Sequence, residues 1–491
     1  MKGKIMKLRT IFYGLTSGLL LGLSSCSLNY EPLDTYSDVT EGVTSDGTKI
    51  VFKDKAAVES HLTTLYNQMR DRQEHWYVDL LLISDSHSDN AYAGTTGAEV
   101  VPFENNSIEG SNSVLERDWN RYLEDVARAN KLICNIDLVT DNSLTTAERA
   151  QYKAEAKIFR AMVMFDMVRL WGDFPVITTV ADDITSENID EVYPQYFPKQ
   201  NTELEAYQQI EKDLLDAVLY APDNTPGNKT LFSKSVARTL LAKIYAEKPL
   251  RDYTKVIQYC DEVKADGFDL VDDFSDLFGM NAAGTDAKMR NTKESILVNW
   301  NNNFTWAKWV TPSRDLISAF KQEGDEVRFK ESIVYYDCNW SNYYPSDNYP
   351  FMYKCRSANS SIIKYRYADV LLLKAEALIM QDTPDLEGAA DIIDEVRDRA
   401  KLGALPTSVR SNKNVLLNAL LKERRLELAF EGQRWFDLVR LDKVEEVMNA
   451  VYSKDSGRKA QIYTFDKNSY RLPIPQSVID ANDKIHQNPG Y

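Results

Sequence analysis

Residues able to do metal or catalytic chemistry are few in this sequence. Only four histidines are present, and the one ligand-like spacing is Asp85-x-His87-x-Asp89. On a strand these three side chains would share a face and would be able to hold a metal ion. The alternative that we favour is a solvated loop in which the aspartates form turns. Neither a metal nor a cofactor is therefore expected.

Motifs of established enzyme chemistry are missing from the sequence. It has no His-Glu-x-x-His, no Gly-x-Ser-x-Gly, no glycine-rich phosphate loop and no dinucleotide fingerprint. Carboxylate pairs are abundant, but this is expected of an acidic chain, and none can be selected for glycoside hydrolysis. The sequence therefore predicts no catalytic residue and a protein that is not an enzyme.

Aromatic residues gather in two stretches without helical periodicity, at about 76–113 and 270–361. An aromatic ring stacks on the flat apolar face of a sugar while neighbouring amides bond the sugar hydroxyls. The second stretch combines such rings with several asparagines. The alternative is that the rings fill a small core beneath the loops. The predicted ligand contacts are Trp300, Trp306, Trp309, Trp340, Tyr343, Trp76 and Tyr92, with Trp306 and Trp309 as first choices.

The composition excludes several classes of protein. The chain has 491 residues, of which 43% are hydrophobic and 27% charged, as is usual for globular proteins. Its 58 basic and 74 acidic residues give a net charge of −16 without a long basic run, which argues against a nucleic-acid partner. A long apolar stretch occurs only at the N-terminus, which excludes a protein with several membrane spans.

The N-terminus, residues 1–25, predicts a bacterial lipoprotein signal. Four basic side chains precede the apolar run 11–23, which has the length of a signal-peptide core. The run ends in Leu23-Ser24-Ser25-Cys26, and a cysteine after two small residues is the acylated position of such signals. The alternative is an ordinary signal peptide with a chance cysteine. We expect a lipid anchor at Cys26, a tether over 26–50 and export to the outer membrane.

The remaining four cysteines fit an exported protein only loosely. Cys134 and Cys260 lie in helical patterns and are predicted to be small buried side chains. Cys338 and Cys355 flank a tyrosine-rich loop, and an exported setting would allow them to pair. The sequence leaves this disulfide open.

Helical periodicity accounts for most of the rest of the chain. A capping box, Thr145-x-x-Glu148, opens the clearest helix, and Gly172 with Pro175 ends it. Alanine-rich faces and short connections favour stacked antiparallel helix pairs of the tetratricopeptide-like kind. The predicted fold is mainly α, with long irregular loops and a few short strands, one of them at 294–300. The predicted helices are 56–70, 114–135, 146–170, 202–220, 233–247, 253–264, 365–380, 386–399, 415–430 and 433–447.

Charged residues interrupt the apolar faces of these helices. Such charges are buried only when they are paired. We therefore interpret them as ion pairs between helices that stabilise the scaffold. The residues concerned are Arg160, Arg169, Arg366, Asp369, Glu376, Glu423, Arg424, Glu427, Arg434 and Asp437.

Four groups of motifs resemble signatures of the SusD/RagB family of nutrient-binding lipoproteins. They are 154–161 with 168–175, then 365–377, then 423–440, and finally Leu472-Pro473-Ile474-Pro475-Gln476 with Gln487-Asn488-Pro489-Gly490-Tyr491. Together with the lipoprotein signal, the resemblance covers essentially the whole mature chain. It implies an N-terminal region over 51–230 and a C-terminal region over 231–491 within one compact helical body.

The resemblance also implies a function. Family members are surface lipoproteins of Bacteroidota that capture oligosaccharides and pass them to a SusC-type TonB-dependent transporter. The implied location is the cell outer membrane, lipid-anchored and facing the extracellular side. Two alternatives stay open, namely a structural lid or scaffold of the transporter, and capture of peptides instead of glycans. The ligand contacts are expected in the variable loops, where this chain has its tryptophans.

Overall fold

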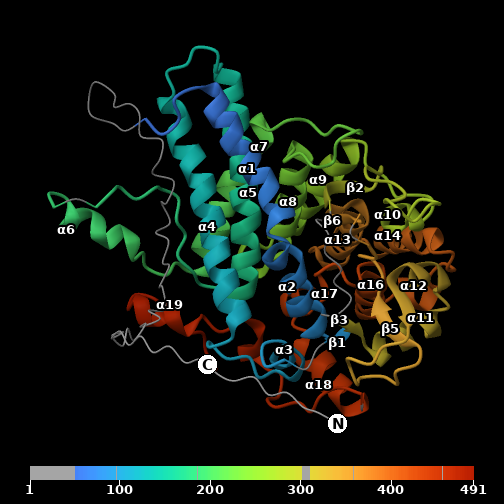
Figure 1. Ribbon diagram of the computed structural model, residues 1–491. Helices are drawn as coiled ribbons and strands as arrows, with labels where there is room; N and C mark the ends of the chain where they lie inside the picture. Colours follow the sequence, from blue (N-terminus) through green and yellow to red (C-terminus); the bar gives the residue numbers. More distant parts are fainter. Residues whose placement is uncertain (1–49, 95–96, 185, 301–309, 358, 456) are drawn as a thin grey trace, which may run out of the picture. The chain divides into compact units, whose positions relative to one another are not determined.

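The structure, a computed structural model, describes residues 50–94, 97–184, 186–300, 310–357, 359–455 and 457–491 (Figure 1). The predicted fold class is confirmed, since this part of the chain is mainly helical with a few short strands. Contacts within it define one compact unit. The predicted signal peptide and almost all of the predicted tether lie outside the described residues.

The helices follow one another through the whole described chain. Their bounds are α1 Lys55–Asp71, α2 Asp79–Leu81, α3 Val101–Asn105, α4 Ser113–Asn135, α5 Thr146–Trp171, α6 Ile189–Val192, α7 Glu203–Tyr220, α8 Lys234–Ala246, α9 Tyr253–Ala265, α10 Ser275–Phe278, α11 Arg314–Glu323, α12 Glu326–Ser332, α13 Tyr367–Met380, α14 Leu386–Arg399, α15 Thr407–Arg410, α16 Lys413–Glu427, α17 Arg434–Arg440, α18 Val444–Lys454 and α19 Gln476–Ala481.

The strands form short antiparallel pairs between distant segments. In the described residues β1 pairs with β3, β2 with β6, and β4 with β5. The β1–β3 pair sets Tyr92 opposite Thr311, and the β4–β5 pair sets Tyr336 opposite Tyr349. The bounds are β1 Ala91–Ala93, β2 Ser295–Trp300, β3 Val310–Pro312, β4 Ile333–Tyr336, β5 Tyr349–Met352 and β6 Ser361–Arg366. The predicted strand at 294–300 is thereby confirmed as β2.

The first group of helices is built around α5, which packs against α4 and α7 (Figure 1). The predicted capping box is present, because Thr145 Oγ1 accepts the backbone N–H of Glu148 and the Glu148 carboxylate accepts that of Thr145. Gly172 follows the last turn with φ +74°, a conformation that favours glycine. The C-terminal half of α5 is buried all round, so this helix is the centre of its group.

The second group confirms the predicted helix pairs. Helix α8 packs against α9, α13 packs against α9, α14 and α16, and α7 connects the two groups by packing against α8. The one-carbon side chains of the alanine-rich faces allow this close approach, as in Ala237, Ala242 and Ala246, which are all fully or almost fully buried.

One expectation about the secondary structure is wrong. Residues 433–447 form two helices, α17 and α18, because Asp442 adopts φ +55° between them. The stretches at 76–113 and 270–361 contain long irregular segments, as predicted, together with short elements. The first contains two π-helical turns, Glu74–Val78 and Leu82–Ser86, with α2 between them, and the second contains α10 to α12 and most of the strands.

The apolar core consists of one large cluster that spans both helix groups and two small ones. One small cluster is aromatic and lies beneath the β4–β5 loop; its members are Tyr92, Cys338, Tyr343, Tyr349 and Phe351. Among the described helices, none has both the length and the apolar character needed to cross a bilayer.

Candidate functional site

The most exposed tryptophan whose side chain is described is Trp340. It lies in the loop 337–348, between β4 and β5, and 39% of its surface is exposed. Its ring centroid is 5.9 Å from that of Tyr349 and 5.9 Å from that of Phe351, with tilted ring planes. Packing on one side and exposure on the other leave Trp340 able to receive a flat apolar ligand face.

Polar groups surround this ring on the same loop. Asn339, Asn342 and Asn348 are all exposed, and their amides can both donate to and accept from sugar hydroxyls. The loop is held by its own backbone, since Cys338 N–H donates to the Ser346 carbonyl at 2.8 Å. We name residues 337–348 the Trp340 loop.

The ring of Tyr343, predicted as a ligand contact, faces inward from this loop. It is buried, stacks on Tyr92 at 5.0 Å between centroids, and its hydroxyl donates to Glu104 Oε2 at 2.6 Å. Burial, the charge of Glu104 and this hydrogen bond raise the pKa of Tyr343 well above its usual range. This corrects the predicted surface position of Tyr343, since a phenol with a buried carboxylate as partner belongs to the core.

The predicted surface position of Tyr92 is also wrong. It is fully buried on β1, and its hydroxyl donates to Asp455 Oδ2 at 2.6 Å. Burial and the Asp455 carboxylate raise the pKa of Tyr92 to about 12. The alternative of a small aromatic core beneath the loops therefore holds for Tyr92 and Tyr343, whereas Trp340 lies on top of that core.

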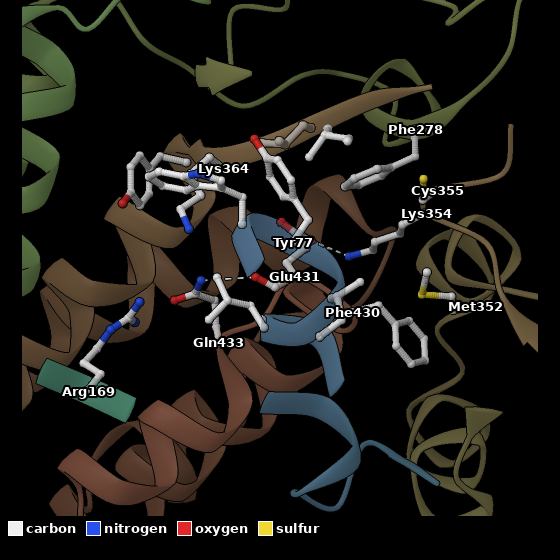
Figure 2. Close-up of a pocket in the computed structure, with 17 residues that line it drawn as sticks. Tyr77, Arg169, Phe278, Met352, Lys354, Cys355, Lys364, Phe430, Glu431 and Gln433 are labelled. Atoms are coloured by element: carbon white, nitrogen blue, oxygen red, sulfur yellow. Dashed lines mark hydrogen bonds and ion pairs between the residues drawn. The ribbon is translucent and has the colours of Figure 1, made fainter. Parts of the chain in front are cut away.

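Trp76 lies in a different part of the molecule. It is fully buried and lines a small, partly open cavity of about 50 Å³ with Tyr77, Lys354, Lys364 and Glu431 (Figure 2). Figure 2 shows Lys354 beside Glu431, where the Lys354 ammonium donates to Glu431 Oε1 at 2.5 Å. A cavity of this size holds a few water molecules but no sugar ring. The predicted surface-loop position of Trp76 is therefore corrected as well.

The other three predicted tryptophans are not tested by the geometry. Trp300 ends β2, where its backbone is the partner of Ser361, and its side chain is not described. Trp306 and Trp309 lie outside the described residues. All three stay predictions as ligand contacts.

An open groove meets the Trp340 loop. Its volume is about 410 Å³, within the range of about 300–1,000 Å³ that is usual for small-molecule sites. Lys459 connects the groove to the loop, because its Nζ lies 3.5 Å from Asn342 Oδ1 and 5.0 Å from the centre of the Tyr343 ring. The groove is lined by Asn449, Tyr452, Asp455, Arg458, Lys459 and Gln461, among others.

Sequence reasoning missed the groove and part of the loop surface. Tyr336 on β4 is 57% exposed, and its ring lies 6.2 Å from that of Phe351, close to Trp340. The adjacent pair Tyr335 and Tyr336, both exposed on a short strand, was the available signal. No sequence signal pointed to Lys459, because its contact with the loop, at Asn342, is between residues 117 positions apart in the sequence.

The three ligand-like residues of the first long stretch are buried, so the interpretation as a solvated loop is wrong. Asp85 accepts the backbone N–H groups of Phe430 at 3.1 Å and Gly432 at 3.3 Å. His87 Nδ1 donates to the Phe103 carbonyl at 2.6 Å, and Asp89 pairs with Arg434. Burial raises the pKa of Asp85 to about 6 and lowers that of His87 to about 4. Each side chain has a structural partner of its own.

The prediction that these charges are buried as ion pairs is confirmed, but not every pair joins two helices. Arg169 pairs with Asp166 on the same helix, α5, and Arg434 pairs with Asp89, which precedes β1. All ten charged residues singled out in the motifs are buried and paired. Glu427 is the most connected, since Arg328, Arg366 and Arg399 all donate to its carboxylate. Burial alone would raise the pKa of Glu427, but these three cations hold it well below its usual range. The charged motifs are therefore structural in this protein.

The four described cysteines are all free thiols, and they differ in exposure. Cys260 is buried as predicted, whereas Cys134 is exposed, contrary to prediction. Cys338 and Cys355 are buried free thiols, so the structure contains no bond between them.

Together, the fold and the loop define a class of protein, a mainly α body of stacked helix pairs that presents an aromatic loop at its surface. Two family models match this chain, that of the SusD family over residues 347–491 and that described as starch-binding, associating with outer membrane, over residues 33–246. The chain belongs to the SusD/RagB family, as its motifs predicted.

Relatives and solved structures agree with this assignment. A SusD-like protein of Formosa agariphila is 27% identical, with 90% of this chain and 93% of that protein covered. A SusD homolog from Bacteroides thetaiotaomicron has a TM-score of 0.73 at 21% identity, with 89% of this chain and 97% of that chain covered. A laminarin-binding SusD-like protein has a TM-score of 0.69 at 23% identity, covering 90% and 100%. At these identities the structural likeness shows the fold.

Proposed function

We propose that this protein is an outer-membrane lipoprotein that captures oligosaccharides at the cell surface and passes them to a SusC-type TonB-dependent transporter. The observation that carries the proposal is the half-exposed ring of Trp340, packed on Tyr349 and bordered by asparagine amides. This arrangement offers a stacking surface together with hydrogen-bonding groups. The family description, starch-binding and associating with outer membrane, supports the same role.

The expected affinity is modest. Covering about 100 Å² of apolar ring surface contributes roughly 2–3 kcal/mol, and association costs part of what a few such contacts supply. Binding in about the micromolar to millimolar range follows. Weak binding suits a protein that must release its ligand to a transporter.

Anchoring and partner belong to the same proposal. Acylation of Cys26 would hold the folded body at the membrane, and the transporter would receive the ligand from it. Such a protein needs no catalytic group, and the buried charges described above have structural partners. Trp300, at the end of β2, and Trp306 and Trp309, between β2 and β3, are proposed as further ligand contacts.

The test compares Trp340→Ala with a matched exposed aromatic, Tyr220→Ala, which is 50% exposed and lies at the end of α7, outside the Trp340 loop. Each variant is scored by thermal melting and by retardation in gels that contain polysaccharides. We expect Trp340→Ala to keep its melting temperature and lose retardation, and Tyr220→Ala to keep both. Unchanged retardation of Trp340→Ala would show that Trp340 is not the stacking residue. Trp306→Ala and Trp309→Ala would then be scored in the same way.

A further inference from the structure

The groove beside the Trp340 loop contains a buried guanidinium with unused donors. The Arg458 side chain is only 1% exposed, and its Nη2 donates to the Ser88 carbonyl at 3.0 Å. Its Nε and Nη1 have no hydrogen-bond acceptor of normal geometry among the described residues, although the guanidinium also interacts with the Tyr452 side chain. The nearest carboxylate oxygen, Asp455 Oδ2, is 3.8 Å from Nε, which is too far for a hydrogen bond. Buried donors without an acceptor are costly, and they indicate a missing partner.

The position of this guanidinium is well defined. Its central carbon lies 5.2 Å from the centre of the Tyr92 ring and 5.6 Å from that of Tyr452. The guanidinium thus lies close to both rings. A guanidinium fork matches the paired oxygens of a carboxylate or a sulfate.

A second cation stands where the groove meets the loop. Lys459 Nζ lies near Asn342 and the Tyr343 ring, and within the described chain it has no carboxylate partner. The hydrogen bonds of Arg314 go to uncharged groups. Its Nη2 donates to the Tyr343 carbonyl at 2.6 Å, and its Nη1 donates to the Tyr92 hydroxyl at 3.3 Å. Neither cation is neutralised by an ion pair in the part of the structure that is described.

The carboxylates of this region already have donors. Asp455 accepts from the Tyr92 hydroxyl and from the Gly457 N–H at 3.0 Å. Glu104 accepts from the Tyr343 hydroxyl, from the Lys459 N–H at 2.7 Å and from the Ala93 N–H at 2.9 Å.

Cations and carboxylates are both present around the groove. Arg314, Arg458 and Lys459 lie near Asp455 and Glu104, and Arg458 also helps to lower the pKa of Asp89, which is paired with Arg434. The loop also carries two exposed acids, Asp337 and Asp347, at its ends beside β4 and β5. Asn342, which meets Lys459, lies midway between them in sequence.

We propose that this site takes an anionic glycan, with a carboxylate or sulfate group of one sugar bound by Arg458 and Lys459 while Trp340 stacks on another ring of the same chain. The proposal rests on the function proposed above and narrows its ligand class. Uronate and sulfated sugars share the required chemistry, a sugar ring that carries charged oxygens.

The test uses retardation of the folded protein in gels with five polymers. Two are neutral glycans, laminarin and starch; two are anionic glycans, polygalacturonate and carrageenan; the fifth is polyglutamate, an anionic chain without sugar rings. The variants are Lys459→Gln and Trp340→Ala. The matched control is Lys454→Gln, which removes the same charge from an exposed residue that does not line the groove.

We expect retardation by at least one anionic glycan and less by the neutral glycans or polyglutamate. The retarding glycan identifies the anion as carboxylate or sulfate. Lys459→Gln should weaken that binding about tenfold, since a hydrogen bond between charged groups is lost. Lys454→Gln should change it little, and Trp340→Ala should weaken it although every charge remains.

Three outcomes would overturn the inference. Retardation by laminarin or starch alone, lost in Trp340→Ala, would refute the anionic ligand and leave the proposed function standing. Equal retardation by polyglutamate, or equal losses in the two lysine variants, would show simple ion exchange. Retardation by none of the five polymers would count against both proposals.

Discussion

Arg434 on α17 and Asp89 before β1 form a two-point ion pair across 345 residues of sequence. Arg434 Nε lies 2.8 Å from Asp89 Oδ1, and its Nη2 lies 2.9 Å from Oδ2. Both side chains are buried. Burial alone would raise the pKa of Asp89, but Arg425 and Arg434 hold it well below its usual range. The pair thereby connects the segment just before β1 to helix α17 near the C-terminus.

Replacing Arg434 by Ala should lower the free energy of unfolding by about 3–5 kcal/mol, because the Asp89 carboxylate would stay buried with less compensation. Urea denaturation measures this. The control is Lys248→Ala, which breaks an exposed pair with Asp442 and should cost about 0–1 kcal/mol. Equal stability of Arg434→Ala and the unaltered protein would show that the pair adds nothing.

His87 should make the stability depend on pH. Its pKa is about 4 in the folded protein and about 6.5 in the unfolded chain. Between these values the unfolded chain binds a proton that the folded protein does not, so stability falls as the pH drops. The expected loss from this group is about 2 kcal/mol between pH 7.5 and pH 5.

The variant His87→Gln should lose this part of the pH dependence and keep an amide donor for the Phe103 carbonyl. Urea denaturation of both proteins at the two pH values gives the comparison. The opposite contribution of Asp85, whose raised pKa favours the folded state at low pH, is common to both and cancels. Identical pH dependence in the two proteins would refute the assignment to His87.

Cys26→Ala should abolish acylation and leave the protein as a precursor or in soluble form. Growth with a radioactive fatty acid followed by precipitation of the protein measures the label. A serine elsewhere in the tether, such as Ser37→Ala, serves as the control. Equal label in Cys26→Ala would disprove the lipoprotein signal.

Thiol labelling should separate the other four cysteines. In a soluble form that begins at Ser27, the exposed Cys134 should react with an aromatic disulfide reagent before unfolding, although burial raises its pKa and slows the reaction. Cys260, Cys338 and Cys355 should react only in denaturant. Cys134→Ser should abolish the early reaction. Only two reactive thiols after unfolding without reductant would reveal a disulfide between Cys338 and Cys355.

Local patterns predicted the helices well, because their signals are short-range. The capping box of Thr145 and Glu148 and the stop at Gly172 act within a few residues, and the structure contains both. The break at Asp442 had no such signal, since neither proline nor glycine marks it.

Exposure within the aromatic stretches could not be read from the sequence. Trp340 and Tyr343 are three residues apart in one loop, yet one is exposed and the other buried. Tyr343 faces inward because Glu104 and Tyr92, more than two hundred residues earlier, offer it a hydrogen bond and a stacking partner. The residue types indicated a possible platform, but long-range contacts decide which ring serves as one.

The contact between Tyr343 and Glu104 limits how this protein can be re-engineered. A loop transplanted from a relative brings a new residue to position 343, whereas Glu104 stays behind with its carboxylate aimed at the vacated place. Removing one member of a buried hydrogen-bonded pair leaves the other unsatisfied. Specificity in this scaffold is therefore transferable only in matched sets, with the loop, β1 and the segment around Glu104 exchanged together.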